Sequence, residues 1–256
     1  MSEYFDIHTH ILPHVDDGSS SSAESIEMLC ALYSQGATRV AATPHFYAMS
    51  DEPERFLNRR SVAIDRLVSQ IAEASSQDET LMDRLPDMYL GAEVSFFNAM
   101  SNSSELLGLC LSGTKYLLVE MPFDRWTVAH AQELREINKK RGITPIIAHI
   151  DRYFGCFNEQ MLDEMIKNGV KVQINADAFL RLFTRRRSLE LISSGKVHFL
   201  GSDSHNMQKR APNIAAAVRV IRKRLGEDAL DEIVKNSREL SKTALPVFRA
   251  RGHRND

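Results

Sequence analysis

Residues 116–149 read YLLVEMPFDRWTVAHAQELREINKKRGITPIIAH, and this stretch contains one complete repeat of the fold. Its two ends, Tyr116–Glu120 and Pro145–His149, are almost continuously apolar up to a final acidic residue or histidine. Such runs are typical of strands that are covered on both faces of a sheet. The segment between them, Val128–Arg141, has the pattern of a helix that ends at Gly142. A strand, a helix and a second strand in this order predict a parallel βα unit.

The same alternation extends over most of the chain. We expect seven strands, at Tyr4–His8, Arg39–Thr43, Met88–Val94, Tyr116–Glu120, Pro145–His149, Lys171–Asn175 and Val197–Ser202. From Met88 onward the strand starts are spaced 26 to 29 residues apart. We expect helices between Ser21 and Gly36 and at Pro53–Ser75, Ser104–Leu111, Val128–Arg141, Glu159–Lys167, Ala178–Ser194, Ile214–Leu225 and Asp228–Val234. Seven βα units predict a closed or nearly closed parallel barrel, and a doubly wound open sheet is the alternative. We find no linker, so we expect one domain over residues 1–256 with a frayed tail.

Composition excludes several classes of protein but indicates no activity. The 256 residues include 32 basic and 34 acidic ones, for a net charge of −2, which argues against a generally basic nucleic-acid binder. No apolar run reaches the roughly 18–20 residues of a membrane helix, and the N-terminus lacks the layout of a signal peptide. Three cysteines without metal-ligand spacing (Cys30, Cys110 and Cys156) predict a reduced, cytoplasmic protein.

Six of the seven expected strands have a metal-ligand type of residue at or near their C-terminal ends. These residues are His8, His10, His45, Glu93, Glu120, His149, Asp203 and His205, and Asp17 follows the first strand in the sequence VDDG. Parallel α/β folds build their active sites at this face. Imidazoles and carboxylates together suit zinc, manganese or iron, and carboxylates can bridge two ions. The pattern therefore predicts a shared site for two or three metal ions.

The remaining histidines are not assigned to the metal site, and the motifs of several other enzyme classes are absent. We assign structural roles to His130 and His198, place His253 in the tail, and leave His14 open as a site residue. The chain has no G-x-G, no P-loop and no G-x-S-x-G. No arginine stands six places after a cysteine, which excludes Cys-x5-Arg thiolate chemistry. We expect the nucleophile to be water on a metal ion.

At these residues the sequence resembles a known superfamily. The segments DIHTHILPHVDDG, TPH, GAEV, AHIDRY and GSDSHN, in this order, are similar to the polymerase and histidinol phosphatase (PHP) superfamily. The closer resemblance is to its bacterial CpsB/YwqE-like branch, the tyrosine-protein phosphatases of capsule and exopolysaccharide synthesis. It implies a distorted (β/α)7 TIM-like barrel and a metal cluster, commonly trinuclear, of Mn, Fe, Zn, Co or Mg ions.

The resemblance also implies a ligand set. The first ion takes His8, His10, Glu93 and Asp203, the second takes Glu93, Glu120 and His149, and the third takes Asp17, His45 and His205. Glu120 stands where other members often have a histidine. Asp16 is the alternative to Asp17, and we choose Asp17 because a glycine follows it.

The implied activity is that of a metal-dependent protein-tyrosine phosphatase, in which metal-bound hydroxide attacks phosphorus. Arg152 and Arg210 are the candidates for orienting the phosphate, with an Arg152–Asp151 ion pair or a role for Lys209 as the alternatives. Phe46, Tyr47 and Phe154 either pack on the substrate ring or fill the core. The implied partner is a bacterial tyrosine kinase. The alternatives are a phosphatase for a small ester such as histidinol phosphate and a non-catalytic regulatory module.

Two basic clusters remain to be placed. We interpret them as solvated helix faces, with the guidance of an acidic, phosphorylated tail as the alternative. They consist of Arg181, Arg185, Arg186 and Arg187, and of Arg219, Arg222, Lys223 and Arg224.

Overall fold

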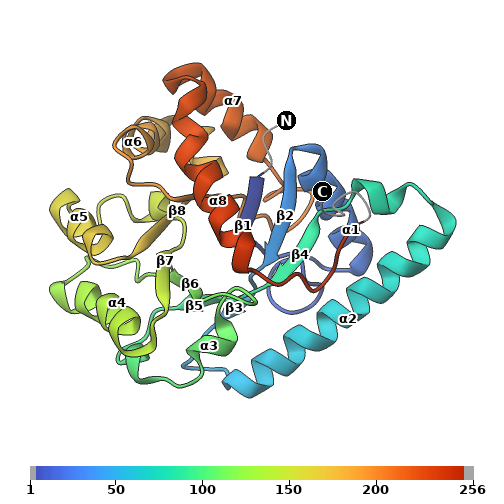
Figure 1. The fold of residues 1–256 in the computed structure, drawn as a ribbon, viewed down its shortest axis with the longest axis horizontal. Helices are drawn as coiled ribbons and strands as arrows, with labels where there is room; N and C mark the ends of the chain where they lie inside the picture. Colours follow the sequence, from blue (N-terminus) through green and yellow to red (C-terminus); the bar gives the residue numbers. More distant parts are fainter. Residues whose placement is uncertain (1–3, 251–256) are drawn as a thin grey trace.

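A computed structural model describes residues 4–250. It contains short strands that alternate with helices along the chain (Figure 1). The strands are β1 (Tyr4–Thr9), β2 (Ala37–Ala42), β3 (His45–Phe46), β4 (Asp87–Leu90), β5 (Glu93–Ser95), β6 (Tyr116–Glu120), β7 (Thr144–Ile147), β8 (Lys171–Asn175) and β9 (Phe199–Gly201). The α-helices are α1 (Ser22–Ser34), α2 (Pro53–Gln77), α3 (Leu106–Leu109), α4 (Val128–Arg141), α5 (Glu159–Lys167), α6 (Leu182–Ser193), α7 (Ile214–Leu225) and α8 (Asp231–Thr243). None of the helices among these residues is long and apolar enough to cross a membrane.

The named strands pair in parallel and form a curled sheet. One ladder has the order β1-β2-β4 and the other has the order β3-β5-β6-β7-β8-β9. The two ladders join where β2 leads into β3 and β4 leads into β5, because Gly91 N donates to Ala42 O and Glu93 N donates to Pro44 O. The far edge returns to β1, since Asp203 N donates to His8 O at 2.8 Å just after β9. The α/β class and the parallel pairing are therefore as predicted.

Some of the predicted strand and helix boundaries are wrong. The strand expected at Met88–Val94 is interrupted at Gly91 and Ala92, and the short strand β3 was not predicted. A side chain at position 91 would bring its Cβ to 2.7 Å from Leu111 Cδ2, so a larger residue at this break would displace the Leu111 side chain. The helix expected at Ala178–Ser194 is a 3₁₀ turn, η4 (Ala176–Phe179), followed by α6. The helices α4, α5 and α7 have the predicted bounds.

The apolar core lies on both sides of the sheet. A smaller cluster includes Phe5, Ile7 and Phe199 of the strands with Leu240 of α8. A larger cluster fills the space between the strands and the surrounding helices. The segment after α8 pairs with β4, because Met88 N donates to Phe248 O. The predicted frayed tail and His253 lie outside the described residues.

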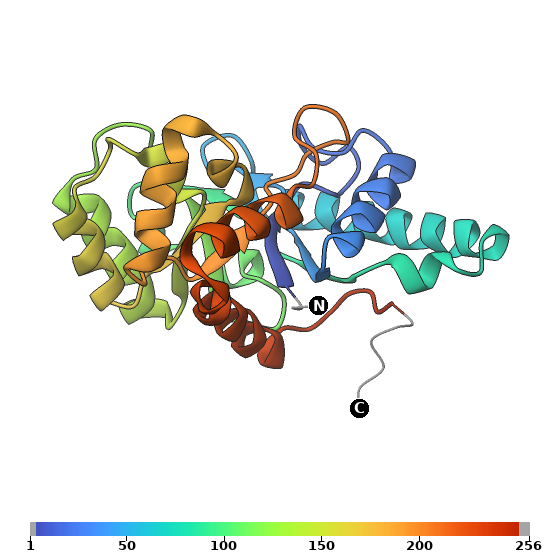
Figure 2. The same ribbon diagram turned by 90° about the horizontal axis from the view of Figure 1, so that it is seen from above.

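Figure 2 shows that the start of β1 and the segment after α8 lie on one side of the sheet, and that the loops after β1 and β9 lie on the other side. Since the strands are parallel, their C-terminal ends point toward these loops. The ligand-type residues of the sequence are therefore brought to one face.

Candidate metal centre

The predicted ligand residues converge in three overlapping groups. Within each group, ligand-type atoms of all members lie within 4.8 Å of one another. The groups are His10, Asp17, His45 and His205; His8, His10 and Asp203; and His45, Glu93 and Glu120. His149 is adjacent, with Nε2 at 2.6 Å from Glu93 Oε1 and 3.7 Å from Glu120 Oε1. The eight strand-end residues and Asp17 of the first loop thus come together.

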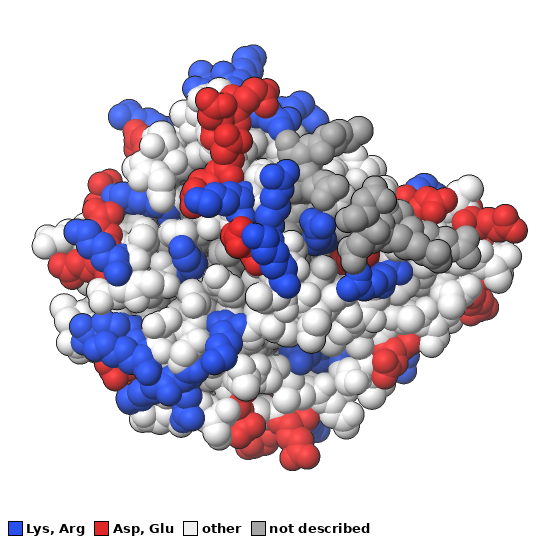
Figure 3. Space-filling model, viewed as in Figure 1, with Lys and Arg blue, Asp and Glu red and all other residues white. Residues whose placement is uncertain are grey.

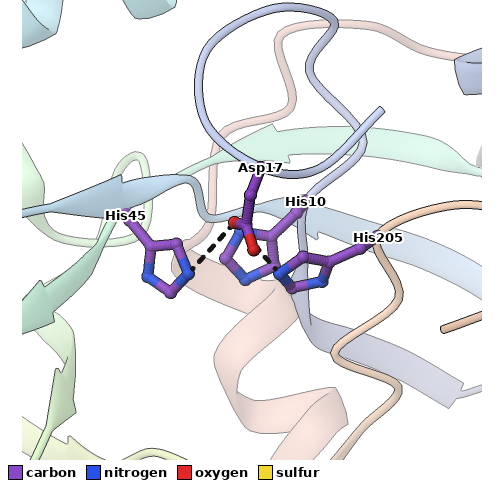
Figure 4. A group of neighbouring side chains, drawn as sticks. All are labelled: His10, Asp17, His45 and His205. Atoms are coloured by element: carbon purple, nitrogen blue, oxygen red, sulfur yellow. Dashed lines mark ion pairs between the residues drawn. The ribbon is translucent and has the colours of Figure 1, made fainter. Parts of the chain in front are cut away.

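The first group combines the loop after β1 with three strand ends (Figure 4). Asp17 Oδ1 lies 3.4 Å from the Nε2 atoms of both His45 and His205. The Asp17 side chain is 67% exposed, so it reaches the histidines from the solvent side. Burial and the positive charges of His10 and Arg210 lower the pKa of His205 to about 3. Its ring is therefore neutral at pH 7, which a metal ligand requires.

The second group contains two histidines that point at each other. His8 Nε2 and His10 Nε2 are 3.2 Å apart in a fully buried setting. Glu93 Oε2 lies 3.2 Å from the first nitrogen and 3.4 Å from the second. Two nitrogen lone pairs facing each other require a proton or a cation between them. Hydrogen bonds and charges from Asp16 and Glu93 outweigh the effect of burial and raise the pKa of His10 to about 10. The pocket thus favours positive charge.

Glu93 is the centre of the cluster. Its Oε2 also lies 2.9 Å from His45 Nδ1, so this carboxylate contacts His8, His10, His45 and His149. It is 1% exposed, and its Oε2 has no hydrogen-bond partner among the described residues. Burial raises the pKa of Glu93, but the charges of His8 and His149 hold it well below the usual value. A buried, ionised and central carboxylate is suited to bridging two ions.

Asp16 and Asp17 have different surroundings. Asp16 Oδ2 accepts from His10 Nδ1 at 2.7 Å and from His45 N at 2.9 Å, and Oδ1 accepts from Gly18 N at 3.0 Å. An acceptor at Nδ1 keeps a proton there, so a bound metal ion would replace the second proton, at Nε2. Asp16 therefore orients His10 from behind, while Asp17 faces the shared centre.

Two site residues occupy strained backbone. His149 has φ of 29° and Asp203 has φ of 52°, in the left-handed region that favours glycine. Such conformations cost on the order of 1–3 kcal/mol each and cluster at functional sites. They turn both side chains into the cluster just after β7 and β9.

The two predicted arginines lie beside the cluster. Arg152 forms an ion pair with Asp203 Oδ2, and Arg210 Nη2 lies 2.5 Å from Asp203 Oδ1. The alternative pairing of Arg152 with Asp151 is wrong, because Asp151 instead accepts from Asn175 N at 2.9 Å. Both arginines line a cavity of about 410 Å³ that Lys209 also borders. Cationic groups thus stand next to the metal-ligand set.

A second cavity, of about 740 Å³, adjoins Asp17 and His45 on the side of α2. Tyr47 lines it and stacks on His45, with ring centroids 5.3 Å apart. Burial and the nearby carboxylates raise the pKa of Tyr47 to about 12. Of the other two aromatic candidates, Phe46 is buried in the core and Phe154 lies under Arg187. Only Tyr47 among the three lines this cavity.

The residues assigned structural roles fit those roles. His198 Nδ1 accepts from Val172 N, and His130 Nδ1 accepts from Thr127 N at the start of α4. His14 is exposed and belongs to none of the three groups. The three cysteines are free, and burial raises the pKa of Cys110 to about 12. None of the three cysteines belongs to the ligand groups.

The first basic cluster is partly engaged within the chain, whereas Arg219, Lys223 and Arg224 of the second are exposed on α7, as expected for a solvated helix face. Arg185 donates to the carbonyls of Phe179 and Leu180, and Arg186 pairs with Glu190. Figure 3 shows the face opposite the site, where basic side chains gather over the end of α4. That helix ends in Lys139, Lys140 and Arg141. Lys140 and Arg141 donate to Ser101 and Asn102, so these two side chains are also engaged within the chain.

Comparisons with known proteins agree with this geometry. The family described as "Capsular polysaccharide synthesis, CpsB/CapC" matches residues 4–241. Tyrosine-protein phosphatase YwqE of Bacillus subtilis is 30% identical over 251 residues, covering 95% of this chain and 93% of the relative. Tyrosine-protein phosphatase CpsB of Streptococcus agalactiae is 28% identical over 250 residues, covering 93% of this chain and 98% of the relative.

A solved structure supports the same relationship. It is described as "Crystal structures of YwqE from Bacillus subtilis and CpsB from Streptococcus pneumoniae, unique metal-dependent tyrosine phosphatases". It superimposes with a TM-score of 0.79 at 28% identity and covers 96% of this chain and 100% of the solved one. The resemblance drawn from the motifs is confirmed.

Proposed function

The chain belongs to the CpsB/CapC capsular polysaccharide synthesis family, and we propose from this premise that it is a metal-dependent protein-tyrosine phosphatase. The observation that carries the proposal is the convergence of three ligand groups around the buried carboxylate of Glu93. Folded proteins rarely bury so many imidazole and carboxylate groups together without a cation to compensate them.

The proposed ligand set has three parts. His8, His10, Glu93 and Asp203 would hold one ion, Glu93, Glu120 and His149 a second, and Asp17, His45 and His205 a third. The distances of 2.6–3.7 Å between facing atoms and the orphaned Glu93 Oε2 support this division. Manganese is the ion we would test first, with Fe, Zn, Co and Mg as competitors.

The scaffold we propose is a distorted (β/α)7 barrel formed by the whole chain as one domain. Counting β2 with β3 and β4 with β5 reduces the nine strands of residues 4–250 to seven positions. The contact between Asp203 N and His8 O supports closure of the ring.

The chain's own side chains suit the hydrolysis of a phosphate monoester. Divalent ions at such a site supply Lewis-acid charge and activate water for attack on phosphorus. Arg152 and Arg210 would hold the phosphoryl oxygens through forked hydrogen bonds, since both guanidinium groups border the cavity beside Asp203. Tyr47 would pack against the substrate ring in the cavity next to His45.

The physiological substrate we propose is phosphotyrosine on a bacterial tyrosine kinase of capsule or exopolysaccharide synthesis, in the cytoplasm. Tyr47, Arg55 and Val62 line a surface cavity that would receive a side chain presented by another protein. The relatives named as tyrosine-protein phosphatases favour this substrate over histidinol phosphate and over a non-catalytic role.

The test combines metal content with a substrate panel. Purified protein is stripped with chelator, reloaded with Mn²⁺, and assayed on a phosphotyrosine peptide and on histidinol phosphate. We expect activity only after reloading and a clear preference for the peptide in kcat/KM. Activity that persists in chelator would overturn the metal-dependent mechanism, and a strong preference for histidinol phosphate would overturn the tyrosine assignment.

A further inference from the structure

The strand β8 contributes no residue to the predicted ligand set, yet it borders the cluster. It ends in Gln173 and Asn175, which are separated by two positions and therefore face the same side. Gln173 is fully buried and Asn175 is 5% exposed. Buried amide side chains are costly unless their hydrogen-bonding groups are satisfied, so their partners are informative.

The two amides connect residues of three other strands. Gln173 Oε1 accepts from the backbone N of His149 at 2.6 Å and lies 3.2 Å from His8 Nδ1. Gln173 Nε2 donates to Asn175 Oδ1 at 2.9 Å. Asn175 Nδ2 then donates to Asp203 Oδ2 at 2.8 Å. One continuous chain of hydrogen bonds thus runs from His149 and His8 to Asp203.

The groups at the two ends of this hydrogen-bond chain fix which atom donates and which accepts in each of its bonds. A backbone N–H such as that of His149 can only donate, and an ionised carboxylate such as that of Asp203 can only accept. Each amide between them therefore has a single orientation, with the oxygen of Gln173 toward the histidines. An oxygen beside His8 Nδ1 requires the proton on that nitrogen. His8 Nε2 is then left bare, and this is the atom that faces His10 and Glu93.

The packing around Gln173 leaves room for this arrangement. A Cβ at Gly201 would lie 2.6 Å from Gln173 Nε2 and 2.9 Å from His8 Cβ. Glycine at this position of β9 therefore lets the amide fit between β9 and β1. The bond from His149 N also holds the residue whose φ is 29°.

We propose that Gln173 and Asn175 are positioning residues that select the metal-binding tautomer of His8 and orient the carboxylate of Asp203. This inference rests on the proposed metal-dependent function and deepens it. Neither side chain needs to touch the ions. Partners of metal ligands at this distance typically change metal affinity or activity about 10- to 100-fold when they are removed.

The experiment compares Gln173→Met with Gln173→Glu. The methionine has a similar length but no acceptor, whereas the glutamate keeps an oxygen toward His8 and His149. The control is Gln132→Met, the same change at an exposed position of α4. For each protein, Mn²⁺ binding to the chelator-stripped form is measured by calorimetry, and the melting temperature is measured in chelator.

We expect Gln173→Met to weaken Mn²⁺ binding about 10- to 100-fold. Gln173→Glu keeps the acceptor for His8 and His149 but loses the donor to Asn175 Oδ1, so we expect it to recover only part of that loss. Gln132→Met should bind as the wild type does. Equal affinity of Gln173→Met and wild type would overturn the inference, as would an equal loss in Gln173→Glu. Wild-type protein that binds no Mn²⁺ would instead overturn the proposed metal-dependent function.

A second measurement needs no variant, so it remains decisive if Gln173→Met does not fold. Wild-type protein with ¹⁵N-labelled histidine is loaded with diamagnetic Zn²⁺, and long-range ¹H–¹⁵N correlations locate the proton on each ring. We expect the His8 proton on Nδ1 and the metal on Nε2. A metal-bound Nδ1 would contradict the polarity of the amide chain.

Discussion

Changing Asp16 to asparagine should lower the stability of the metal-free protein, whereas changing Asp17 to asparagine should weaken metal binding. Asp16 is 7% exposed and its two oxygens accept three hydrogen bonds, from His10 Nδ1, His45 N and Gly18 N. Asparagine has one accepting oxygen, so its NH₂ group must face at least one of these donors. Asp17 is 67% exposed, and its carboxylate faces His45 and His205.

The magnitudes follow from these contacts. One donor left without an acceptor costs about 1–3 kcal/mol, so Asp16→Asn should lose on the order of 2 kcal/mol of stability before any metal is bound. For a chain of this size that corresponds to a fall of roughly 4–8 °C in melting temperature. Asp17→Asn should change the stability by no more than about 0.5 kcal/mol, as an exposed substitution. Its effect should appear in metal uptake.

The assay is thermal melting in chelator, followed by Mn²⁺ titration of each stripped protein. Asp16→Asn should melt lower than wild type, and Asp17→Asn should melt with wild type but bind Mn²⁺ more weakly or in a smaller amount. The reasoning is refuted if Asp17→Asn destabilises the stripped protein as much as Asp16→Asn does. It is also refuted if Asp17→Asn retains the full affinity and stoichiometry of wild type.

Three further predictions concern the mechanism and stability. Asp203→Ala should remove most phosphatase activity while Cys156→Ser keeps it, measured as kcat/KM on a phosphotyrosine peptide; an inactive but folded Cys156→Ser protein would contradict a metal-based nucleophile. Arg210→Lys keeps the charge but loses the fork, and we expect a fall of about 10-fold or more in kcat/KM, with unchanged activity arguing against bidentate phosphate binding. Burial and the charge of Lys171 lower the pKa of His198 from 6.5 to about 4. Between these two pH values His198 binds more protons in the unfolded protein than in the folded one, so stability is lost as the pH falls from 6.5 toward 4. His198→Asn keeps an acceptor for Val172 N, so its melting temperature in chelator should fall less steeply over this range; identical slopes would contradict the assignment.

The alternation of strands and helices could be predicted because it has a local signature. Val128–Arg141 is preceded and followed by apolar runs, and α4 has these bounds in the structure. The breaks in the strands could not be predicted in the same way. At the break, Gly91 lies against Leu111, which is 20 positions away and approaches only after folding.

The ligand residues could be predicted because parallel strands place their C-terminal ends on one face. His8, Glu93, His149 and Asp203 needed no knowledge of strand order to be grouped. Their partners needed the folded chain. Arg152 pairs with Asp203 rather than its neighbour Asp151, and nothing in HIDRY distinguishes the two.

By itself the sequence determined the class of fold, the family and the set of residues that meet at the site, because periodicity and chemical type are properties of single segments. Only the tertiary structure decided how those residues are held. The structure shows that Asp16 orients His10 while Asp17 faces the shared centre. It also shows the left-handed backbone at His149 and the hydrogen bonds that link Gln173 through Asn175 to Asp203. Each depends on the direction of a hydrogen bond or the approach of a distant strand. These geometric quantities arise only when segments such as β1 and β8, whose contacting residues His8 and Gln173 are 165 positions apart, are packed together.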